Sequence, residues 1–316
     1  MRRLDNIDLR LIRVFVELAD AGGFGPAQIA LNLSQSTLST HIASLEKKLG
    51  NRLCERGRGG FRLTEFGKAT YAAAKLLFAD IDTFHARIGK ESGRLTGRLR
   101  VGIVDGVVTS PELGLQTALG RYHAYAPDVF VDLWLAPPHE LERALADGRR
   151  DVVVGPMSQK ISGITYKPVY REPHGLYCGQ GHRLFARSDA EITAADIEAA
   201  SFSVRGYLHF DDIYRAHHPK PDGTVMQMEG QAMMILSGAY VGFLPRHIGD
   251  SYVARGEMRV LKASRYSFAS QHFIAVRSSD REHPPIAAFV REVRRQAGPA
   301  GRQDAARPVD AGERPG

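Results

Sequence analysis

A chain of 316 residues with 43% hydrophobic content can bury two or three cores, and its formal charge of +7 favours a polyanionic partner. It has no apolar run of about 18 residues, which excludes a transmembrane helix, and its N-terminal segment lacks the apolar core of a signal peptide. Cys54 and Cys178 are expected in different domains, so no structural disulfide is predicted. We therefore expect a soluble, cytoplasmic protein with no membrane partner.

The first 64 residues have the pattern of a small helical module. Apolar residues recur at helical spacing over residues 8–20, which predicts an amphipathic first helix. Gly22 and Gly23 end it, and Pro26 suits the first turn of a short second helix. A third helix follows, for which Ser34 is the predicted N-cap. Its buried stripe is predicted to consist of Leu38, Ile42, Leu45 and Leu49.

The other face of this third helix carries short polar side chains. These residues are Ser34, Gln35, Ser36, Thr37, Ser39, Thr40 and His41. Such side chains at the start of a helix suit readout of bases in the major groove, where the helix N-terminus also favours phosphate. The alternative is an ordinary solvated helix face. Because the helix stands third in a helix-turn-helix and precedes a basic hairpin, the sequence favours DNA recognition.

Residues 52–64 are predicted to form that hairpin, the wing of a winged helix-turn-helix. Gly59 and Gly60 permit a tight turn. Arg56, Arg58 and Arg62 surround the turn, where they suit backbone phosphates or the minor groove.

These motifs together resemble the signature of the LysR family of bacterial transcription regulators. The matching residues are Phe24, Ala27, Leu31, Leu33, Ser34, Gln35, Ser36, Leu38, Ser39, Ile42, Leu45, Glu46, Leu49, Gly50, Leu53, Arg56, Leu63, Thr64 and Gly67. The sequence departs from the family pattern at Gly25, Gln28, Thr40, His41 and Cys54, which affects base preference more than fold. The resemblance implies an all-α winged helix-turn-helix over residues 1–64, a long linker helix, and a two-lobed α/β domain like a periplasmic binding protein.

Residues 65–91 are predicted to form the linker helix. Thr64 can cap a helix that continues without proline and carries a long apolar stripe. In the family this helix pairs with its twin from a second subunit, so the resemblance implies a dimer. The alternative is packing on the chain's own C-terminal domain.

Residues 97–296 alternate strands and helices, which predicts parallel βαβ units in an effector-binding domain. Within this domain Ser110 and Pro111 are predicted to start a helix. Lobe I is expected to comprise residues 97–166 and 267–296, and lobe II residues 167–266. Residues 297–316 lack apolar periodicity and are predicted to form a disordered tail.

Ligands of such sheets gather at the carboxyl ends of the strands. By analogy with the family, the predicted effector-binding residues are Gly106, Thr109, Ser110, Pro137, His139, Ser203 and Arg205. An organic acid is one candidate effector, with Thr109 and Ser110 binding its carboxylate and Arg205 supplying charge. In the alternative interpretation Thr109 and Ser110 only cap a helix, and Arg205 lies at the surface.

An enzyme is the rival class. Cys178 and His182 are spaced like a thiolate with its base or half a metal site, but no second ligand pair or catalytic motif accompanies them. Isolated histidines such as His174 and His272 are predicted to be structural or exposed. We therefore expect no catalytic residue, metal or cofactor. The sequence predicts a DNA-binding transcription regulator whose promoter binding responds to an effector between two lobes. By family resemblance it is a dimer or tetramer that contacts RNA polymerase.

Overall fold

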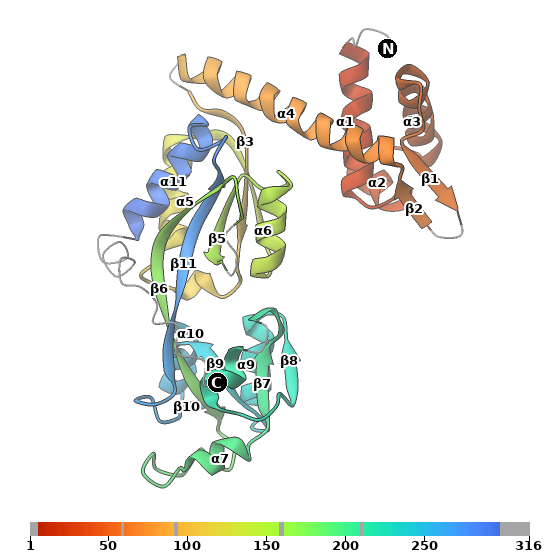
Figure 1. Cartoon of the computed structure of the whole chain (residues 1–316). Coiled ribbons are helices and arrows are strands. Elements are labelled where there is room, and N and C mark those ends of the chain that lie inside the picture. The colour runs from red at the N-terminus through yellow and green to blue at the C-terminus, as the bar shows by residue number, and fades with distance from the viewer. Residues whose placement is uncertain (1–5, 58–59, 92–93, 158–160, 209–210, 298–316) are drawn as a thin grey trace. The chain divides into compact units, whose positions relative to one another are not determined.

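The computed structural model describes residues 6–57, 60–91, 94–157, 161–208 and 211–297. The chain divides into two compact units, Met1–His85 and Ala86–Gly316 (Figure 1). Of the predicted disordered tail, residues 298–316 lie outside the described residues.

The first unit is a three-helix module followed by a hairpin and the start of a long helix. Its elements are α1 (Asn6–Asp20), α2 (Phe24–Leu31), α3 (Gln35–Leu49), β1 (Cys54–Gly57), β2 (Gly60–Leu63) and α4 (Glu65–Glu91). Phe15, Leu38 and Leu45 are fully buried where α1 packs on α3. The first helix begins at Asn6, two residues before the prediction. The hydroxyl of Ser34 accepts a hydrogen bond from the Thr37 amide, so the predicted N-cap of α3 is confirmed.

The hairpin is joined tightly to the helices on either side of it. β1 and β2 are antiparallel, and Gly57 pairs with Gly60 at the end of the ladder, while Gly59 of the predicted turn lies outside the described residues. Thr64 caps α4 through the Gly67 amide, at 2.9 Å, as predicted. A Cβ atom at Gly67 would lie 1.9 Å from the Leu53 carbonyl oxygen, so only glycine permits this approach of α4 to the chain before β1.

Helix α4 has two apolar faces. Tyr71, Ala74 and Phe78 pack against the core of the first unit. A second stripe at alternating spacings of three and four residues consists of Phe66, Ala69, Ala73 and Leu76, all exposed. The Leu76 side chain is 69% exposed. Such spacing is that of a coiled-coil seam.

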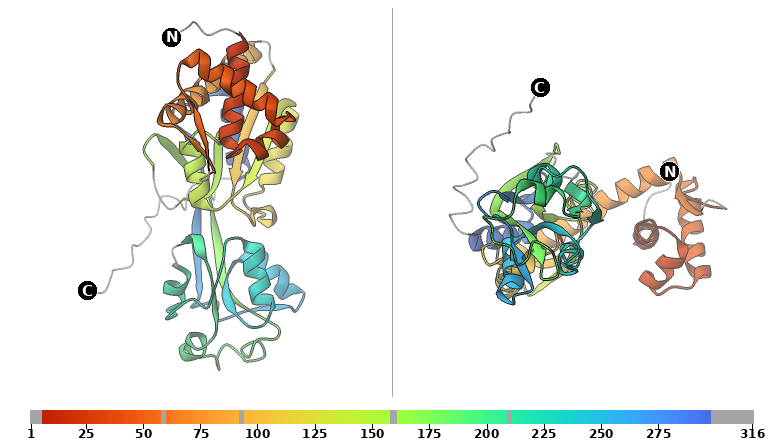
Figure 2. Two further views of the ribbon diagram at one scale, coloured as in Figure 1. Left: turned by 90° about the vertical axis from the view of Figure 1, so that its right-hand side faces the viewer. Right: turned by 90° about the horizontal axis from the view of Figure 1, so that it is seen from below.

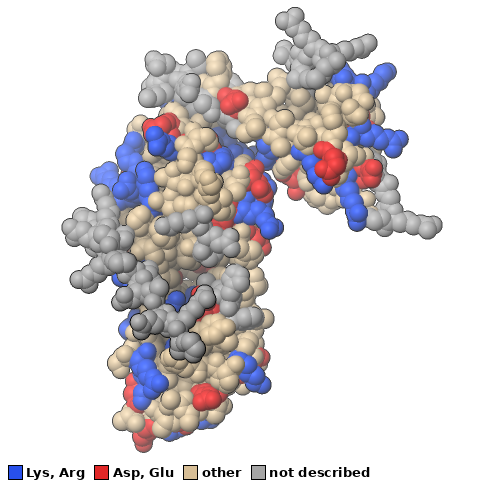
Figure 3. Space-filling model, viewed as in Figure 1, with Lys and Arg blue, Asp and Glu red and all other residues tan. Residues whose placement is uncertain are grey.

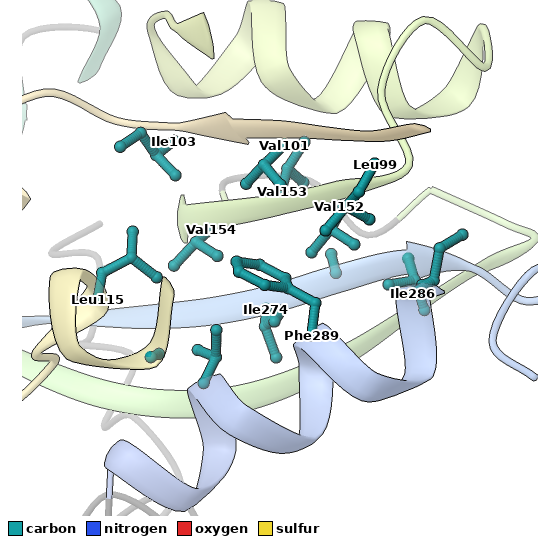
Figure 4. Packing of buried hydrophobic residues seen from close by; sticks show 14 of the residues in the cluster. Leu99, Val101, Ile103, Leu115, Val152, Val153, Val154, Ile274, Ile286 and Phe289 are labelled. Atoms are coloured by element: carbon teal, nitrogen blue, oxygen red, sulfur yellow. The ribbon is translucent and has the colours of Figure 1, made fainter. Parts of the chain in front are cut away.

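Lobe I of the second unit is a parallel sheet covered by helices. Its elements are β3 (Thr96–Ile103), the 3₁₀ turn η1 (Val107–Thr109), α5 (Leu115–Tyr125), β4 (Asp128–Leu135), α6 (Pro138–Ala146), β5 (Val152–Pro156) and the closing helix α11 (Pro284–Gln296). Strand β3 lies between β4 and β5 and is parallel to both, which confirms the predicted βαβ arrangement. In Figure 4 aliphatic side chains of the strands meet Phe289 of α11.

Two long strands connect the lobes. Strands β6 (Ile164–Gly179) and β11 (Ser267–Arg277) pair in antiparallel fashion along the whole length of β11. Figure 1 and the left view of Figure 2 show them side by side between the lobes. A register shift occurs between His272 and Phe273. The connection is therefore a two-stranded ribbon.

Lobe II completes the sheet with a second set of strands and helices. Its elements are α7 (Ala194–Glu198), β7 (Phe202–Arg205), η2 (Gly206–Leu208), α8 (Asp211–Ala216), β8 (Gly223–Val225), α9 (Met228–Leu236), β9 (Val241–Pro245), α10 (Arg246–Ala254) and β10 (Met258–Val260). The sheet order is β4-β3-β5-β11-β6-β9-β7-β8, with β10 paired to β6. The predicted fold class is confirmed: an N-terminal winged helix-turn-helix, a long linker helix and a two-lobed C-terminal α/β domain.

One predicted helix start in lobe I is wrong. The sequence predicts a helix from Ser110, whereas α5 begins at Leu115. The Ser110 hydroxyl instead accepts a hydrogen bond from the Leu113 amide at 3.3 Å and closes a turn. The Ser110 hydroxyl is therefore already hydrogen-bonded within lobe I.

Candidate DNA-binding face and effector cleft

Helix α3 presents its polar residues outward. Gln35, Ser36 and Thr40 are exposed, and Thr37, Ser39 and His41 are half-buried. The hydroxyls of Ser39 and Thr40 donate to helix carbonyls four residues earlier, at 2.7 Å and 2.9 Å. These bonds satisfy the hydroxyl protons inside the helix. The first two turns of α3 thus form a small, flat, polar surface of the kind that enters a major groove.

The wing is held against α3 by a half-buried contact. The Glu46 carboxylate accepts hydrogen bonds from the amides of Leu53 and Cys54, at 2.7 Å and 3.4 Å, so the last turns of α3 fix the start of β1. Arg62 is exposed on β2, opposite Glu55 in the register. Arg56 lies in β1 but its side chain is outside the described part, as is the whole of Arg58. Figure 3 shows basic side chains projecting from this unit.

Two adjoining cavities lie between the lobes of the second unit. The larger, of about 400 Å³, is lined by Asp105, Gly106, Val108, Thr109, Leu135, Gln227, Met228, Glu229, Ala232, Ile248, Ser251, Tyr252 and Arg255. The smaller, of about 60 Å³, is lined by Val104, Asp105, Pro156, Glu172, Arg205, Tyr207, Asp211, Arg215, Met228, Phe268, Ser270 and His272. Asp105 and Met228 belong to both linings, so they stand at the junction.

Asp105 joins the two lobes directly. It follows β3, and its carboxylate accepts a short hydrogen bond from the backbone amide of Met228, the first residue of α9. Burial raises the pKa of Asp105, while the Met228 amide acts in the opposite direction. The neighbouring Gly106 has φ of +76°, and a Cβ there would press against Met228 and Ile248 at 3.0 Å. Glycine therefore allows lobe I to approach lobe II at this loop.

A buried carboxylate beside the smaller cavity is surrounded by histidines. Glu172 of β6 lies 3.1 Å from His247 Nε2 and 3.2 Å from His272 Nε2. Contact with His272 and His247 outweighs burial and holds the Glu172 pKa far below its ordinary value. His247 Nδ1 lies 2.8 Å from the Thr109 hydroxyl of lobe I. If each ring carries its proton on Nε2, Glu172 accepts from both, and Thr109 donates to His247 across the cleft.

Arg205 is buried and fully engaged. It donates to Asp212 through Nε at 3.0 Å and Nη2 at 2.7 Å, and its Nη1 lies 3.0 Å from His174 Nε2. Burial, reinforced by Arg205, lowers the pKa of His174 to about 3, so this ring is neutral. Phe268 stacks on His174 at 4.6 Å and carries the Arg215 guanidinium 4.1 Å from its centroid. The alternative interpretation of Arg205 as a surface residue is wrong.

The predicted effector residues are only partly brought together. Gly106 and Thr109 line the larger cavity, and Arg205 lines the smaller one. Ser110 and Ser203 are fully buried in separate lobes, and Ser203 donates to the Val241 carbonyl at 3.3 Å. Pro137 and His139 are absent from both linings.

Several residues of the cleft were not predicted from the sequence. The residues not predicted to bind the effector are Asp105, Glu172, Met228 and His272 of the lining, and His247 beside the cleft. Asp105 had a usable signal, because it directly follows a strand whose carboxyl end faces the expected ligand edge.

The second unit offers no support for the thiol chemistry considered as a rival. Cys178 is fully buried, and burial raises its pKa to about 12, which makes the thiol a poor nucleophile. His182 Nδ1 accepts from the Leu184 amide at 3.2 Å and so has a structural use. Within the described ranges no group of three or more His, Cys, Asp or Glu residues is placed to hold a metal ion, and no helix is long and apolar enough to cross a membrane.

A winged helix-turn-helix joined to a two-lobed domain with an interlobe cavity defines a ligand-responsive DNA-binding protein. Comparison with known proteins identifies the family. Residues 9–68 match the bacterial regulatory helix-turn-helix proteins of the LysR family, and residues 92–298 match the LysR substrate binding domain. The chain belongs to the LysR family of transcription regulators, which are not enzymes.

Individual relatives cover nearly the whole chain. The HTH-type transcriptional activator BauR of Pseudomonas aeruginosa is 34% identical over 92% of this chain and 96% of its own length. A full-length OxyR variant of the same species superposes with a TM-score of 0.64 and 24% identity, covering 94% of this chain and 95% of that one. The structure of full-length CbnR in complex with its target DNA superposes with a TM-score of 0.60 and 20% identity, covering 91% of this chain and 99% of that one. The chain is therefore a LysR-type, DNA-binding transcription regulator with an effector-binding domain.

Proposed function

We propose that the N-terminal half of α3 reads the operator and that the wing holds the DNA backbone. The supporting observation is the outward polar surface of Gln35, Ser36 and Thr40 beside a wing fixed by Glu46. Ser34, Thr37, Ser39 and His41 extend this surface, while Arg56, Arg58 and Arg62 are assigned to phosphates. In this division of roles, base contacts determine sequence preference and basic residues provide salt-dependent affinity.

The active form is proposed to be a dimer or tetramer built on α4. Its exposed stripe from Phe66 to Leu76 supports this, because the opposite face of the helix is already used by the core of the first unit. Two winged modules on a dimer would meet half-sites one helical turn apart. A regulator bound in this way acts in the cytoplasm, where the DNA is, and would contact RNA polymerase at the promoter.

The effector is proposed to bind in the interlobe cavity and to change promoter output. The proposal is tested by a substitution that fills the cavity with a larger, uncharged side chain. Ala232 is a small, buried residue of the lining, so Ala232→Phe should fix transcription of a reporter in one state whatever the growth medium. A reporter that still responds fully to the medium would show that the effector binds elsewhere.

The DNA-binding proposal is tested by selecting genomic fragments with the purified protein and titrating salt on the best site. We expect a dyad-symmetric site. Arg62→Ala should weaken binding evenly across sequences and reduce the salt slope by about one. Thr40→Ala should change the preferred bases and leave the slope unchanged. If both variants behave alike, the proposed division between wing and α3 is wrong. Salt-dependent binding without a dyad would indicate a general DNA binder.

A further inference from the structure

The charge of the interlobe cavities is opposite to that of the chain. Four carboxylates line them, from Asp105, Glu172, Asp211 and Glu229, against the guanidiniums of Arg205, Arg215 and Arg255. Two of those arginines are already paired with carboxylates outside the linings. These pairs are Arg205 with Asp212 and Arg255 with Glu257, at 2.7 Å and 3.0 Å. A protein of net charge +7 thus encloses an acidic site, which favours a cationic ligand over the organic acid considered from sequence.

Asp105 is the acidic group best placed to bind such a ligand. It stands at the junction of both cavities, and among the described residues no basic side chain lies within ion-pair distance of it. Its hydrogen-bond partners are backbone amides, chiefly that of Met228. Burial raises the pKa of Asp105, although these amides and the charge of the Arg205 guanidinium act in the opposite direction. A positively charged donor would supply the missing stabilisation through a charge-assisted hydrogen bond.

Glu172, by contrast, is already satisfied. His247 and His272 reach its two oxygens, and its pKa is held low. The guanidinium of Arg215 lies over the Phe268 ring in the lining of the smaller cavity, and its positive charge repels a second cation there. The cationic end of a ligand is therefore directed to Asp105 and the remainder to the larger cavity.

The wall of the larger cavity next to Asp105 is hydrocarbon. Val108 and Leu135 of lobe I face Met228, Ala232 and Ile248 of lobe II across it. Such a wall suits a chain of methylene groups, while polar side chains, among them Gln227, Ser251 and Tyr252, complete the lining.

We propose that the effector is an aliphatic primary amine whose ammonium group pairs with Asp105 and whose hydrocarbon body lies between Val108 and Ile248. This rests on the proposed function of the cleft as the effector site. Because Asp105 and Met228 come from different lobes, an ammonium that pairs with Asp105 would compete with the Met228 amide for the carboxylate and so alter the closure of the cleft.

The experiment is isothermal titration calorimetry of the full chain with n-pentylamine and n-pentanoate, which match in length and differ in charge. Wild type should bind the amine at least tenfold more tightly than the acid. Asp105→Asn keeps an acceptor for the Met228 amide and removes only the charge, so amine affinity should fall about tenfold or more. Asp147→Asn, an exposed carboxylate outside both linings, is the matched control and should change nothing.

The outcomes separate this inference from the proposed function. The proposal of an amine effector is overturned if Asp105→Asn leaves the affinity for pentylamine unchanged. It is also overturned if wild type binds pentanoate more tightly than pentylamine. If Ala232→Phe then abolishes pentanoate binding, the cleft remains the effector site and only the ligand class is wrong. If every probe that binds wild type binds Ala232→Phe equally, the cleft itself is wrong. Failure of primary amines of any length from propyl to octyl to bind wild type also overturns the amine.

Discussion

The buried pair of Arg205 and Asp212 makes a quantitative test of the effector domain possible. Both side chains are nearly inaccessible, at 4% and 0% exposure, and two hydrogen bonds join them. Asp212→Asn keeps the shape and one acceptor but leaves the guanidinium charge unbalanced. Removing one partner of a buried pair costs about 3–5 kcal/mol. Since the asparagine retains one acceptor, we expect the lower end of this range, about 3 kcal/mol.

A loss of this size should be visible as a lower melting temperature. For a domain of roughly 150–250 residues, about 3 kcal/mol corresponds to a decrease of roughly 6–12 °C. Trp134 is the only tryptophan of the chain and lies in β4, so its fluorescence reports on the effector domain. The neighbouring Asp211 is exposed in the same turn of α8, so Asp211→Asn is a matched control and should cost under about 0.5 kcal/mol.

Melting temperatures of the two variants within about 2 °C of each other would refute the argument, because the charge of Asp212 would then have no more effect than that of an exposed neighbour. The double variant Arg205→Met with Asp212→Leu distinguishes charge from packing. It removes both charges and should recover most of the lost stability. Failure to recover would assign the loss to packing around β7 and α8.

Three further results are expected. The pKa of His174 is depressed in the folded chain, so on acidification the unfolded chain binds a proton that the folded chain does not. The free energy of unfolding is therefore highest above about pH 6.5 and falls by about 1.4 kcal/mol per pH unit as the pH decreases below it. His174→Gln should flatten this dependence in denaturant titrations. Gly67→Ala should unfold the N-terminal unit and abolish DNA binding in gel-shift assays, because its Cβ would overlap the Leu53 carbonyl oxygen. Leu76→Glu should give a smaller species than wild type in light scattering, whereas Lys68→Glu, exposed off that stripe, should not.

Sequence reasoning worked best where one continuous segment determines the structure. The helical period and the hydroxyl of Ser34 predicted α3 and its cap, and the absence of proline predicted α4. It failed where a hydrogen bond competes locally, as at Ser110, whose hydroxyl closes a turn where a helix start was expected. Periodicity and composition carry no information on such a choice.

The cleft could be predicted in outline only. Its location followed from the rule for the carboxyl ends of parallel strands, but its chemistry comes from residues far apart in the sequence. Glu172, His247 and His272 come together because α10 packs beside the ribbon formed by β6 and β11. His272 carried no signal of its own, since an isolated histidine has the same local sequence whether it is solvated or faces a buried carboxylate.

The size of the interlobe contacts determines what an effector can do. A ligand shifts the closure of the lobes only by the difference in its affinity for the open and closed forms. A tenfold change in promoter occupancy requires about 1.4 kcal/mol, and a hydrogen bond to a charged group contributes about 1.5–3 kcal/mol. Making or breaking the single contact of Asp105 with the Met228 amide is therefore sufficient. By linkage, operator DNA that favours one closure must change effector affinity by the same factor.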